Sequence, residues 1–255
     1  MITSKRKIKI TIGDRMKYCD LTLAPPAENL ACDEALLQLA EEDGKMGEVL
    51  RVWEPMQYFV VVGYANRVGT EVNLPFCQAN TIPVLRRCTG GGTVLQGPGC
   101  LNYSLVLRIA ESGPLQSIPA ANDFILKRHQ AALSELLRAP IEMQGHTDLA
   151  IGGLKVSGNS QRRKRHFLLF HGTFLLHLDI SLVEKALQMP SKEPDYRLNR
   201  SHNDFLLNIK VPSNRIKQAL VKCWGAKELF TGIPFEKISA LAQNKYGRDD
   251  WNFKF

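Results

Sequence analysis

The 255-residue chain has no long hydrophobic run. No stretch approaches the roughly 18 apolar residues that a membrane-spanning helix requires, so we expect no membrane contact. The N-terminal sequence MITSKRKIKITIGDR is basic and lacks the apolar segment of a signal peptide. Within it, Ile8, Ile10 and Ile12 alternate with polar residues, which predicts a strand. We therefore expect a cytoplasmic protein.

The chain also lacks paired cysteines. Its six cysteines, at positions 19, 32, 77, 88, 100 and 223, form no CxxC pair and show no metal-ligand spacing. Isolated cysteines in a chain of this size are typical of small core residues rather than of ligands or disulfides. The stretch from 101 to 222 contains no cysteine at all.

Positive charge exceeds negative charge, but it is not organised for nucleic acid. There are 33 lysines and arginines against 25 acidic residues, a net charge of +8. The one dense run, Arg162 to Arg165, is either a solvated hairpin tip or a functional basic patch. No zinc-finger, helix-turn-helix or RNA-binding signature accompanies it, so we expect no nucleic-acid partner. A basic surface equally suits an acidic protein or an anionic nucleotide.

Hydrophobic periodicity divides the chain into helices and strands. We predict helices at about 27–43, 122–139, 213–224 and 234–246, the second capped by Asn122 or Asp123. Apolar runs predict strands at 49–53 and 58–64, on both sides of a glycine cluster, and in a long stretch interrupted at His171-Gly172. Ser181 and Glu184 form a capping-box pattern for a further short helix. Strands flanked by helices indicate an α/β fold with a mixed or antiparallel sheet, as residues 1–205 plus a helical extension of the same domain over 206–255.

The glycine cluster lies in RRCTGGGTVLQGPGCLNYS, residues 86–104. Glycine permits positive φ and removes every Cβ, so Gly90, Gly91 and Gly92 can form a floor on which a ligand lies against the main chain. A Walker A loop is excluded because no Gly-Lys-Ser/Thr follows. A dinucleotide fingerprint is excluded because the loop joins two strands and does not open a helix. A bulge or slack hairpin is the alternative interpretation.

Arginines and apolar residues surround these glycines. Arg86 and Arg87 alternate faces on a strand, so one of them can point into a ligand cleft, where a guanidinium suits phosphate or carboxylate. Asn102 and Ser104 share a face of the next strand and could orient a polar group. The neighbouring apolar residues are Val84, Leu85, Val94 and Leu95. This combination predicts a ligand with an apolar tail and an anionic head.

A second constellation is DLAIGGLKVSGNSQ, residues 148–161. Lys155 follows a glycine turn on a predicted strand, where its amine can reach a cleft. An ammonium there can neutralise charge that develops on an acyl oxygen or a phosphate. Taken alone, Lys155 would be an ordinary surface lysine; its pairing with the glycine loop favours the functional interpretation.

These motifs carry a family resemblance. RRCTGGGTV…GPGCLNYS followed by DLAIGGLKVSGNSQ…FHGTFLL resembles the lipoate–protein ligase and octanoyltransferase family, which is related to the biotin protein ligases. AENLACDEALL and LRVWEPMQYFVVVGYANRVGTEVN are similar to the family's opening helix and first strands. KEPDYRLNRSHNDFLLN and YGRDDWNF also fit, so the resemblance spans nearly the whole chain.

The resemblance implies a chemistry. In ligases of this family, lipoate and ATP with Mg²⁺ form lipoyl-AMP, which a lysine of a lipoyl-domain acceptor then attacks to give an amide. The family lysine matches Lys155, the implied catalytic residue. Asp148 would lie near adenine or a metal ion, and Gly92 and Lys155 would also contact the nucleotide. The implied substrate-binding residues, along an apolar tunnel, are Arg86, Arg87, Gly90, Gly91, Gly92, Val94, Asn102, Ser104, Ser157, Gly158, His171, Gly172 and Thr173.

The chain departs from the family pattern at three points. Many ligases carry His-Asp where this chain has Gln96-Gly97, and the acidic residue of the family's Asn-Asp pair is preceded here by Thr147. We expect the chain to lack the accessory domain that follows Trp-Asn-Phe in the full-length bacterial ligase. Either the chain functions alone, or a separate accessory protein completes it.

The cysteine pattern separates the activities within the family. The transferases hold the acyl group on a cysteine, either shortly before the Asp–Lys motif or downstream of it, and this chain has none there. Cys88 and Cys100 adjoin the loop without a histidine within sequence reach. We therefore expect an ATP-dependent lipoate–protein ligase. The alternatives are acyl transfer between carrier proteins without ATP, and a non-catalytic acyl-binding relative.

The expected partner is a lipoyl-domain acceptor protein. Lipoyl domains tend to be acidic, which suits the +8 balance of this chain as a means of electrostatic steering. The candidates are the E2 subunit of a 2-oxoacid dehydrogenase, the glycine cleavage H protein, or a related lipoate-binding protein.

Overall fold

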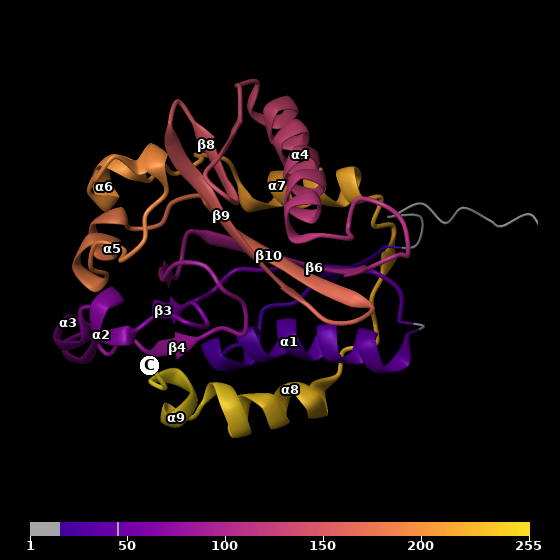
Figure 1. The fold of residues 1–255 in the computed structure, drawn as a ribbon, viewed down its shortest axis with the longest axis horizontal. Helices are drawn as coiled ribbons and strands as arrows, with labels where there is room; N and C mark the ends of the chain where they lie inside the picture. Colours follow the sequence, from indigo (N-terminus) through magenta and orange to yellow (C-terminus); the bar gives the residue numbers. More distant parts are fainter. Residues whose placement is uncertain (1–15, 45) are drawn as a thin grey trace, which may run out of the picture.

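The computed structural model describes residues 16–44 and 46–255 and shows a mixed sheet with helices on both faces (Figure 1). In this part of the chain the larger sheet has the strand order β11-β1-β2-β6-β10-β9-β8-β7. β1 is parallel to β2 and to β11, and the other pairs are antiparallel. The strands are β1 (Lys17–Asp20), β2 (Val49–Trp53), β6 (Cys100–Arg108), β7 (Glu142–Gln144), β8 (Asp148–Ile151), β9 (Leu154–Arg163), β10 (Phe167–Leu175) and β11 (Glu228–Leu229). The predicted α/β class with a mixed sheet is confirmed.

A smaller sheet carries the glycine cluster. It comprises β4 (Val84–Arg86), β3 (Phe59–Val62) and β5 (Val94–Gln96), with β3 in the centre. The glycines therefore join β4 to β5 within this sheet, and a turn at Gly97–Gly99 leads on to β6. The prediction that the loop joins two strands is confirmed, and the short β5 lies between the loop and β6.

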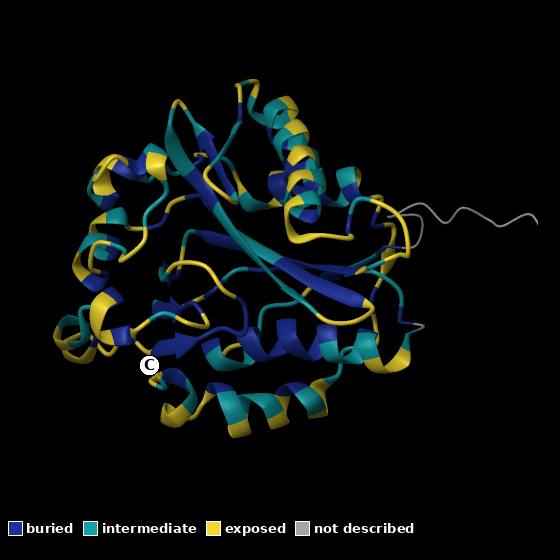
Figure 2. Cartoon of the chain, viewed as in Figure 1, coloured by how far each residue is buried: buried dark blue, intermediate teal, exposed yellow. Residues whose placement is uncertain are grey.

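Two layers of helices enclose the larger sheet. On one face, α4 (Ile118–Leu137) and α7 (Ser213–Trp224) pack together over a core that includes Phe170 and Phe174. On the other face lies α1 (Pro26–Asp43), which is itself covered by α8 (Phe235–Leu241), so that α1 is largely buried (Figures 1 and 2). A π-helical turn, Ala242–Tyr246, and α9 (Asp249–Asn252) bring the chain back to β4.

Short helices surround the small sheet and the end of β9. They are α2 (Val68–Glu71), α3 (Leu74–Ala79), α5 (Ile180–Ala186), a 3₁₀ turn (Asp195–Arg197) and α6 (His202–Phe205). Val60, Val62 and Leu95 of the small sheet share a core with Val183 and Ala186 of α5. The segment 206–255 contributes α7, β11, α8 and α9, and so reaches both faces of the larger sheet.

Most predicted elements were found, with three local errors. The second helix begins at Ile118, because the Ser117 side chain accepts the amide of Ala120, so the cap is not Asn122 or Asp123. Asp179, not Ser181, caps α5 by accepting the amide of Leu182. β10 runs without interruption through His171 and Gly172. The strand predicted at Ile8–Ile12 lies outside the described residues. None of the helices in the described ranges is long and apolar enough to cross a bilayer.

Candidate active site

Five strands of the larger sheet place predicted site residues in one row. Trp53, Asn102, Thr173, Gly158 and Asp148 are paired across β2, β6, β10, β9 and β8. Paired residues on neighbouring strands lie close together, and side chains alternate between the two faces of a sheet. The row therefore brings Asn102, Thr173 and Asp148 to one face, although they are distant in sequence.

A second row lies two residues along each strand, on the same face. It contains Arg51, Ser104, His171 and Ser160. Asp33 of α1 binds both Arg51 and His171, which shows that both rows face α1. The prediction that Asn102 and Ser104 share a face is confirmed, and the structure adds His171 and Thr173 to that face.

Lys155 and Asp148 form the charged end of the first row. The Lys155 Nζ lies 2.9 Å from Asp148 Oδ1, and both side chains keep some exposure, 23% and 11%. Tyr196 donates its hydroxyl to the other Asp148 oxygen at 2.9 Å. Burial and the neighbouring Asp148 carboxylate raise the pKa of Tyr196, so that its hydroxyl stays protonated. The carboxylate thus orients an ammonium that remains reachable from solvent.

Gly158 provides the floor beneath this lysine. A Cβ at Gly158 would lie 2.8 Å from Lys155 Cε and 2.9 Å from Nζ. No real Cβ makes contacts this close, so any larger residue would displace the ammonium. Gly158 is therefore a position where the ion pair itself requires glycine.

The glycine loop lies against β9 and β3. Ser160 donates its hydroxyl to the carbonyl of Gly90 at 2.9 Å. Gly91 has a φ of +86°, a conformation that favours glycine, and a Cβ on Gly63 would overlap the Gly91 carbonyl oxygen. The loop is thus seated by close backbone contact, while Gly90, Gly91 and Gly92 stay exposed on its outer side.

Arg87 holds the loop from beneath. Its guanidinium donates to the Gly90 carbonyl at 2.6 Å and to the Gly92 carbonyl at 2.7 Å. Burial lowers the pKa of Arg87 to about 10, so it remains a cation at neutral pH. No described residue accepts a hydrogen bond from the amides of Gly90, Gly91 or Gly92. These amides are available to an anionic ligand, as in other backbone anion sites.

The structure corrects the prediction that Arg86 contacts the substrate. Its side chain is fully buried. The guanidinium donates to backbone carbonyls of the turn after β3 and of α9, namely Gly63, Tyr64, Asn66, Trp251 and Asn252. Strand alternation sends Arg86 and Arg87 to opposite sides, as expected, but the main chain takes the donors of both. Arg86 is not placed to contact a ligand.

Two further predicted residues, Ser157 and Gly172, face the opposite side of the sheet. Ser157 pairs with Phe174, which belongs to the core under α4. A Cβ on Gly172 would overlap the Asn159 side chain, which accepts from the Tyr103 hydroxyl at 2.5 Å. Ser157 and Gly172 were wrongly predicted as substrate contacts, because each adjoins a residue of the correct face, Gly158 and His171 respectively.

Gln96 closes a ring of hydrogen bonds at the other end of the first row. Its amide donates to Thr173 Oγ1 at 2.6 Å and accepts from Asn102 Nδ2 at 3.0 Å. The Thr173 hydroxyl in turn donates to Asn102 Oδ1 at 2.5 Å. The ring is neutral and largely buried, and it fixes the orientation of all three side chains.

His171 joins the sheet to the glycine loop through residues that the sequence analysis missed. Its Nδ1 lies 3.0 Å from Asp33 Oδ2 and its Nε2 lies 2.7 Å from Thr89 Oγ1. Asp33 also binds Arg51 at 2.6 Å. The available signal was an acidic residue, Asp33, among the apolar residues of LACDEALL, since a buried carboxylate needs a partner.

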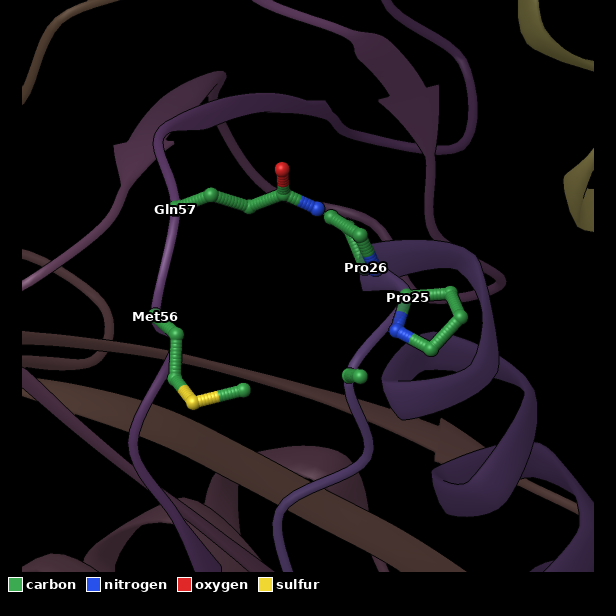
Figure 3. A pocket seen from close by; sticks show the side chains of 5 residues that line it. Pro25, Pro26, Met56 and Gln57 are labelled. Carbon is green, nitrogen blue, oxygen red and sulfur yellow. The ribbon is translucent and has the colours of Figure 1, made fainter.

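The remaining predicted contact, Val94, is half-buried at the start of β5 and packs against the core beneath α1. A shallow depression opens at the start of α1, where Pro25 and Pro26 face Met56 and Gln57 across a gap (Figure 3). This depression contains neither the glycine loop nor Lys155, so we assign it no chemistry.

The donor set around Asp148 does not fit a metal ion held by protein side chains. Its two oxygens bind an ammonium and a phenol. In the ranges 16–44 and 46–255 the structure contains no group of three or more metal-ligating side chains. Mg²⁺ commonly arrives with substrate phosphates and keeps several waters, so Asp148 need not be its resident ligand.

The two cysteines beside the glycine loop are not placed as acyl carriers. All six lie in the described part of the chain, and five of them are buried. Burial raises the pKa of the Cys88 thiol to about 11 and that of Cys100 to about 12. A thiol needs access and a low pKa to act as a nucleophile, and these two have neither.

Comparison with known proteins shows the family of the chain. Residues 25–222 match the lipoyl protein ligase A/B catalytic domain. The octanoyltransferase LipM of Geobacillus kaustophilus is 28% identical over 93% of this chain and 98% of its own. The lipoate-protein ligase A subunit 1 of Thermoplasma acidophilum is 26% identical over 88% of this chain and 90% of its own.

Two solved structures share the fold. One is the bi-partite lipoate protein ligase of Thermoplasma acidophilum, described with its E2 lipoyl domain, with a TM-score of 0.78 and 22% identity over 94% of this chain and 95% of its own. The other is a lipoate-protein ligase A bound with ATP, with a TM-score of 0.76 and 22% identity over 94% of this chain and 98% of its own. Since the family match covers most of the chain, the protein belongs to the lipoyl protein ligase A/B catalytic-domain family, which includes lipoate ligases and octanoyltransferases.

Proposed function

We propose that the protein is an ATP-dependent lipoate–protein ligase. The carboxylate of lipoate attacks the α-phosphorus of ATP, and pyrophosphate leaves, which yields lipoyl-AMP. The neutral amine of an acceptor lysine then attacks the acyl carbon, so that an amide forms, AMP leaves and the amine loses a proton. The observation that carries this proposal is the combination of a Lys155 ammonium and free glycine amides with no accessible thiol beside the glycine loop.

The charged groups and the glycine amides each have a distinct role in the proposed reaction. Lys155 provides a positive charge for the carboxylate and the α-phosphate, where negative charge develops as the acyl–phosphate bond forms. Asp148 keeps that ammonium in place over Gly158. The exposed amides of Gly90 to Gly92 bind the anionic end of the ligand, and Arg87 fixes their orientation from the carbonyl side.

The acyl chain would lie along the face of the sheet that carries the two rows. Val94 supplies an apolar contact there, and the Gln96 ring supplies a neutral polar one. The cofactors are ATP and Mg²⁺, with the metal ion carried on the phosphates. The structure of a relative with the same fold, bound with ATP, supports the proposal that the nucleotide is ATP. The acceptor is a lipoyl-domain protein, a class represented by the E2 lipoyl domain studied with the Thermoplasma ligase.

The test is lipoate-dependent exchange of radioactive pyrophosphate into ATP. Exchange reports adenylate formation without any acceptor, so it does not depend on the choice of lipoyl domain. We expect exchange in the wild-type protein and its loss in Lys155→Ala. If exchange is absent both with and without a candidate accessory protein, the ligase assignment is wrong.

A second candidate is octanoyl or lipoyl transfer between carrier proteins without ATP. The similarity to an octanoyltransferase over 98% of that protein's length favours it. It would require an acyl-enzyme intermediate, seen as a hydroxylamine-labile adduct by mass spectrometry. Full activity in a Cys88→Ser, Cys100→Ser double variant would rule out a thioester on either of these residues.

A further inference from the structure

One chain of hydrogen bonds connects α1 to the glycine loop. It includes neither Lys155 nor Asp148, which form the charged end of the site. It runs from Asp33 through His171 to Thr89, and Thr89 immediately precedes the three glycines. Asp33 and Thr89 are 2% and 1% exposed, so neither can be a solvated surface group. The function proposed above assigns no role to either residue.

Asp33 is an ionised acceptor. Burial by itself would raise its pKa, but the hydrogen bond with His171 and the charge of Arg51 together lower the pKa below its ordinary value. An ionised carboxylate has no hydrogen to donate, so His171 Nδ1 must carry the proton between them. In the neutral imidazole, Nε2 is then an acceptor, and the hydroxyl of Thr89 donates to it. Asp33 thus selects the tautomer of His171.

Thr89 is fixed at two points. Its hydroxyl is bound to His171, and its carbonyl accepts the amide of Tyr64 at 2.9 Å. With Thr89 held, the first glycine starts from a fixed position. Arg87 then holds the carbonyls of Gly90 and Gly92. The loop is therefore anchored on its α1 side by Asp33 and His171 and from beneath by Arg87.

We propose that Asp33 is a positioning residue for acyl activation, which acts through His171 and Thr89 to aim the amides of Gly90 to Gly92 at the ligand. The proposal rests on the ligase function proposed above. It predicts that exchanging the carboxylate for an amide inverts the His171 tautomer. The Asn oxygen stays with the Arg51 cation, and its amino group faces His171 Nδ1, which must then accept. The imidazole proton moves to Nε2, which then donates to the Thr89 hydroxyl, so the direction of this hydrogen bond reverses and the hydroxyl must reorient.

The experiment compares Asp33→Asn, Thr89→Val and the double variant. Asp33→Asn should lower kcat/KM for pyrophosphate exchange by about 100-fold, the size of loss expected when a reacting group is misplaced by about 1 Å. Thr89→Val should lower it to a similar extent, and Thr89→Ser, which keeps the hydroxyl, should stay close to wild type. The double variant should lose no more than either single variant, because both changes act on the same chain of hydrogen bonds.

A second readout follows the tautomer directly. In ¹⁵N spectra of the ligand-free protein, we expect His171 to be protonated at Nδ1 in the wild type and at Nε2 in Asp33→Asn. Glu42→Gln is the matched control, because this carboxylate lies on the same helix but is 60% exposed and bound to Lys237 at the surface. It should leave both the tautomer and the exchange rate unchanged.

Asp33→Asn leaves the buried Arg51 without its counter-ion, which lowers the stability of the fold on its own account. Asp33→Asn/Arg51→Met removes both charges and frees the amide oxygen for His171 Nδ1. This double variant should restore the wild-type tautomer and recover most of the exchange. The inference is overturned if Asp33→Asn keeps wild-type exchange, if the Asp33 and Thr89 losses add, or if the tautomer is unchanged.

Failure of the ligase function would look different. It appears as absent exchange in the wild-type protein, while the tautomer of His171 is still measured without substrate. In that case the same variants are compared in acyl transfer between carrier proteins, where the same non-additive loss is expected.

Discussion

Lys155 and Asp148 form an ion pair across β9 and β8, with 2.9 Å between Nζ and Oδ1. A surface pair of this kind would contribute little, but this one stands at the edge of a row of polar groups on the face that carries the glycine loop. We expect Lys155→Met to lower kcat for pyrophosphate exchange by about 100- to 1000-fold, the loss usually found when one group that stabilises developing negative charge is removed. Lys127→Met is the control, since Lys127 pairs with Asp123 on the exposed side of α4. Equal rates in the two variants would contradict the role of Lys155.

Gly158 tests the same ion pair without removing a charge. In Gly158→Ala the new methyl group would lie 2.8 Å from Lys155 Cε and 2.9 Å from Nζ, too close for both to stay in place. The displaced atoms are the flexible end of a side chain, so we expect little change in the free energy of unfolding and a loss in kcat of about 100-fold. Gly69→Ala is the control, because a Cβ at Gly69 meets nothing within 4 Å. A substantial loss of stability in Gly158→Ala would show that Lys155 cannot move aside.

Gly63 tests how the glycine loop is seated. A Cβ at this position would overlap a backbone carbonyl, that of Gly91, and a backbone cannot move aside as a side chain does. We expect Gly63→Ala to lower the free energy of unfolding by about 1–3 kcal/mol, the usual cost of overpacking, and to abolish lipoate-dependent exchange. Urea denaturation measures the first effect. Gly90→Ala should not lower the stability, because its Cβ would meet nothing within 4 Å; if both variants unfold equally easily, the close contact does not seat the loop.

The Gln96 ring predicts a coupled loss of stability and binding. Gln96→Leu would leave Asn102 Nδ2 and Thr173 Oγ1 each without one partner in a buried setting. We expect the free energy of unfolding to fall by about 1–3 kcal/mol and the KM for lipoate to rise. Gln243→Leu, on the exposed side of the C-terminal π-helical turn, serves as the control. Unchanged stability and KM in Gln96→Leu would mean that the ring neither supports the sheet nor meets the substrate.

His129 predicts how stability depends on pH. It is a fully buried residue of α4 and accepts a hydrogen bond from Trp224 Nε1 at 2.8 Å. Burial lowers the pKa of His129 to about 3, below the ordinary value of about 6.5. Between pH 6.5 and pH 3, His129 therefore binds a proton in the unfolded chain but not in the folded chain. Its contribution to stability is complete above pH 6.5 and is lost as the pH falls toward 3.

The expected size follows from the linkage relation. The free energy of unfolding should fall by about 1.4 kcal/mol per pH unit below pH 6.5, or about 2 kcal/mol between pH 6.5 and pH 5. Urea denaturation over this range measures it. His129→Leu should flatten the slope, and His146→Gln, at an exposed turn, should not. An equal slope in wild type and His129→Leu would contradict the assignment.

The sequence was sufficient to predict most helices and strands and part of the candidate site. Periodicity located α1 and α7 to within a residue, and the alternation of side chains along a strand placed Asn102 and Ser104 on one face. Adjacent residues of a strand point to opposite faces, so the sequence could also have shown that Ser157 and Gly158 do not both face the ligand. The same holds for His171 and Gly172. The sequence could not say which, because that depends on pairing across three strands and on the register shift between Leu149 and Ala150.

Other features depended on contacts between distant segments. The guanidinium of Arg86 donates to carbonyls of α9, 165 or more residues further along the chain, and no local sequence pattern predicts that partner. Asp33 and Thr89 meet through His171 because α1 crosses β10 at that point. Such relationships arise from topology, and single-residue patterns carry no information about them.

The contact between Arg86 and Asn252 also has a consequence for biosynthesis. The amide of Arg86 is bound to the side chain of Asn252, and its guanidinium to the carbonyls of residues 251 and 252. These partners lie 165 and 166 residues beyond Arg86, so a nascent chain that has released the glycine loop from the ribosome still lacks them. Arg86 lies on the strand that leads into the glycine loop, so the loop acquires its full support late. The glycine loop therefore lacks this support until residues 251 and 252 have been synthesised.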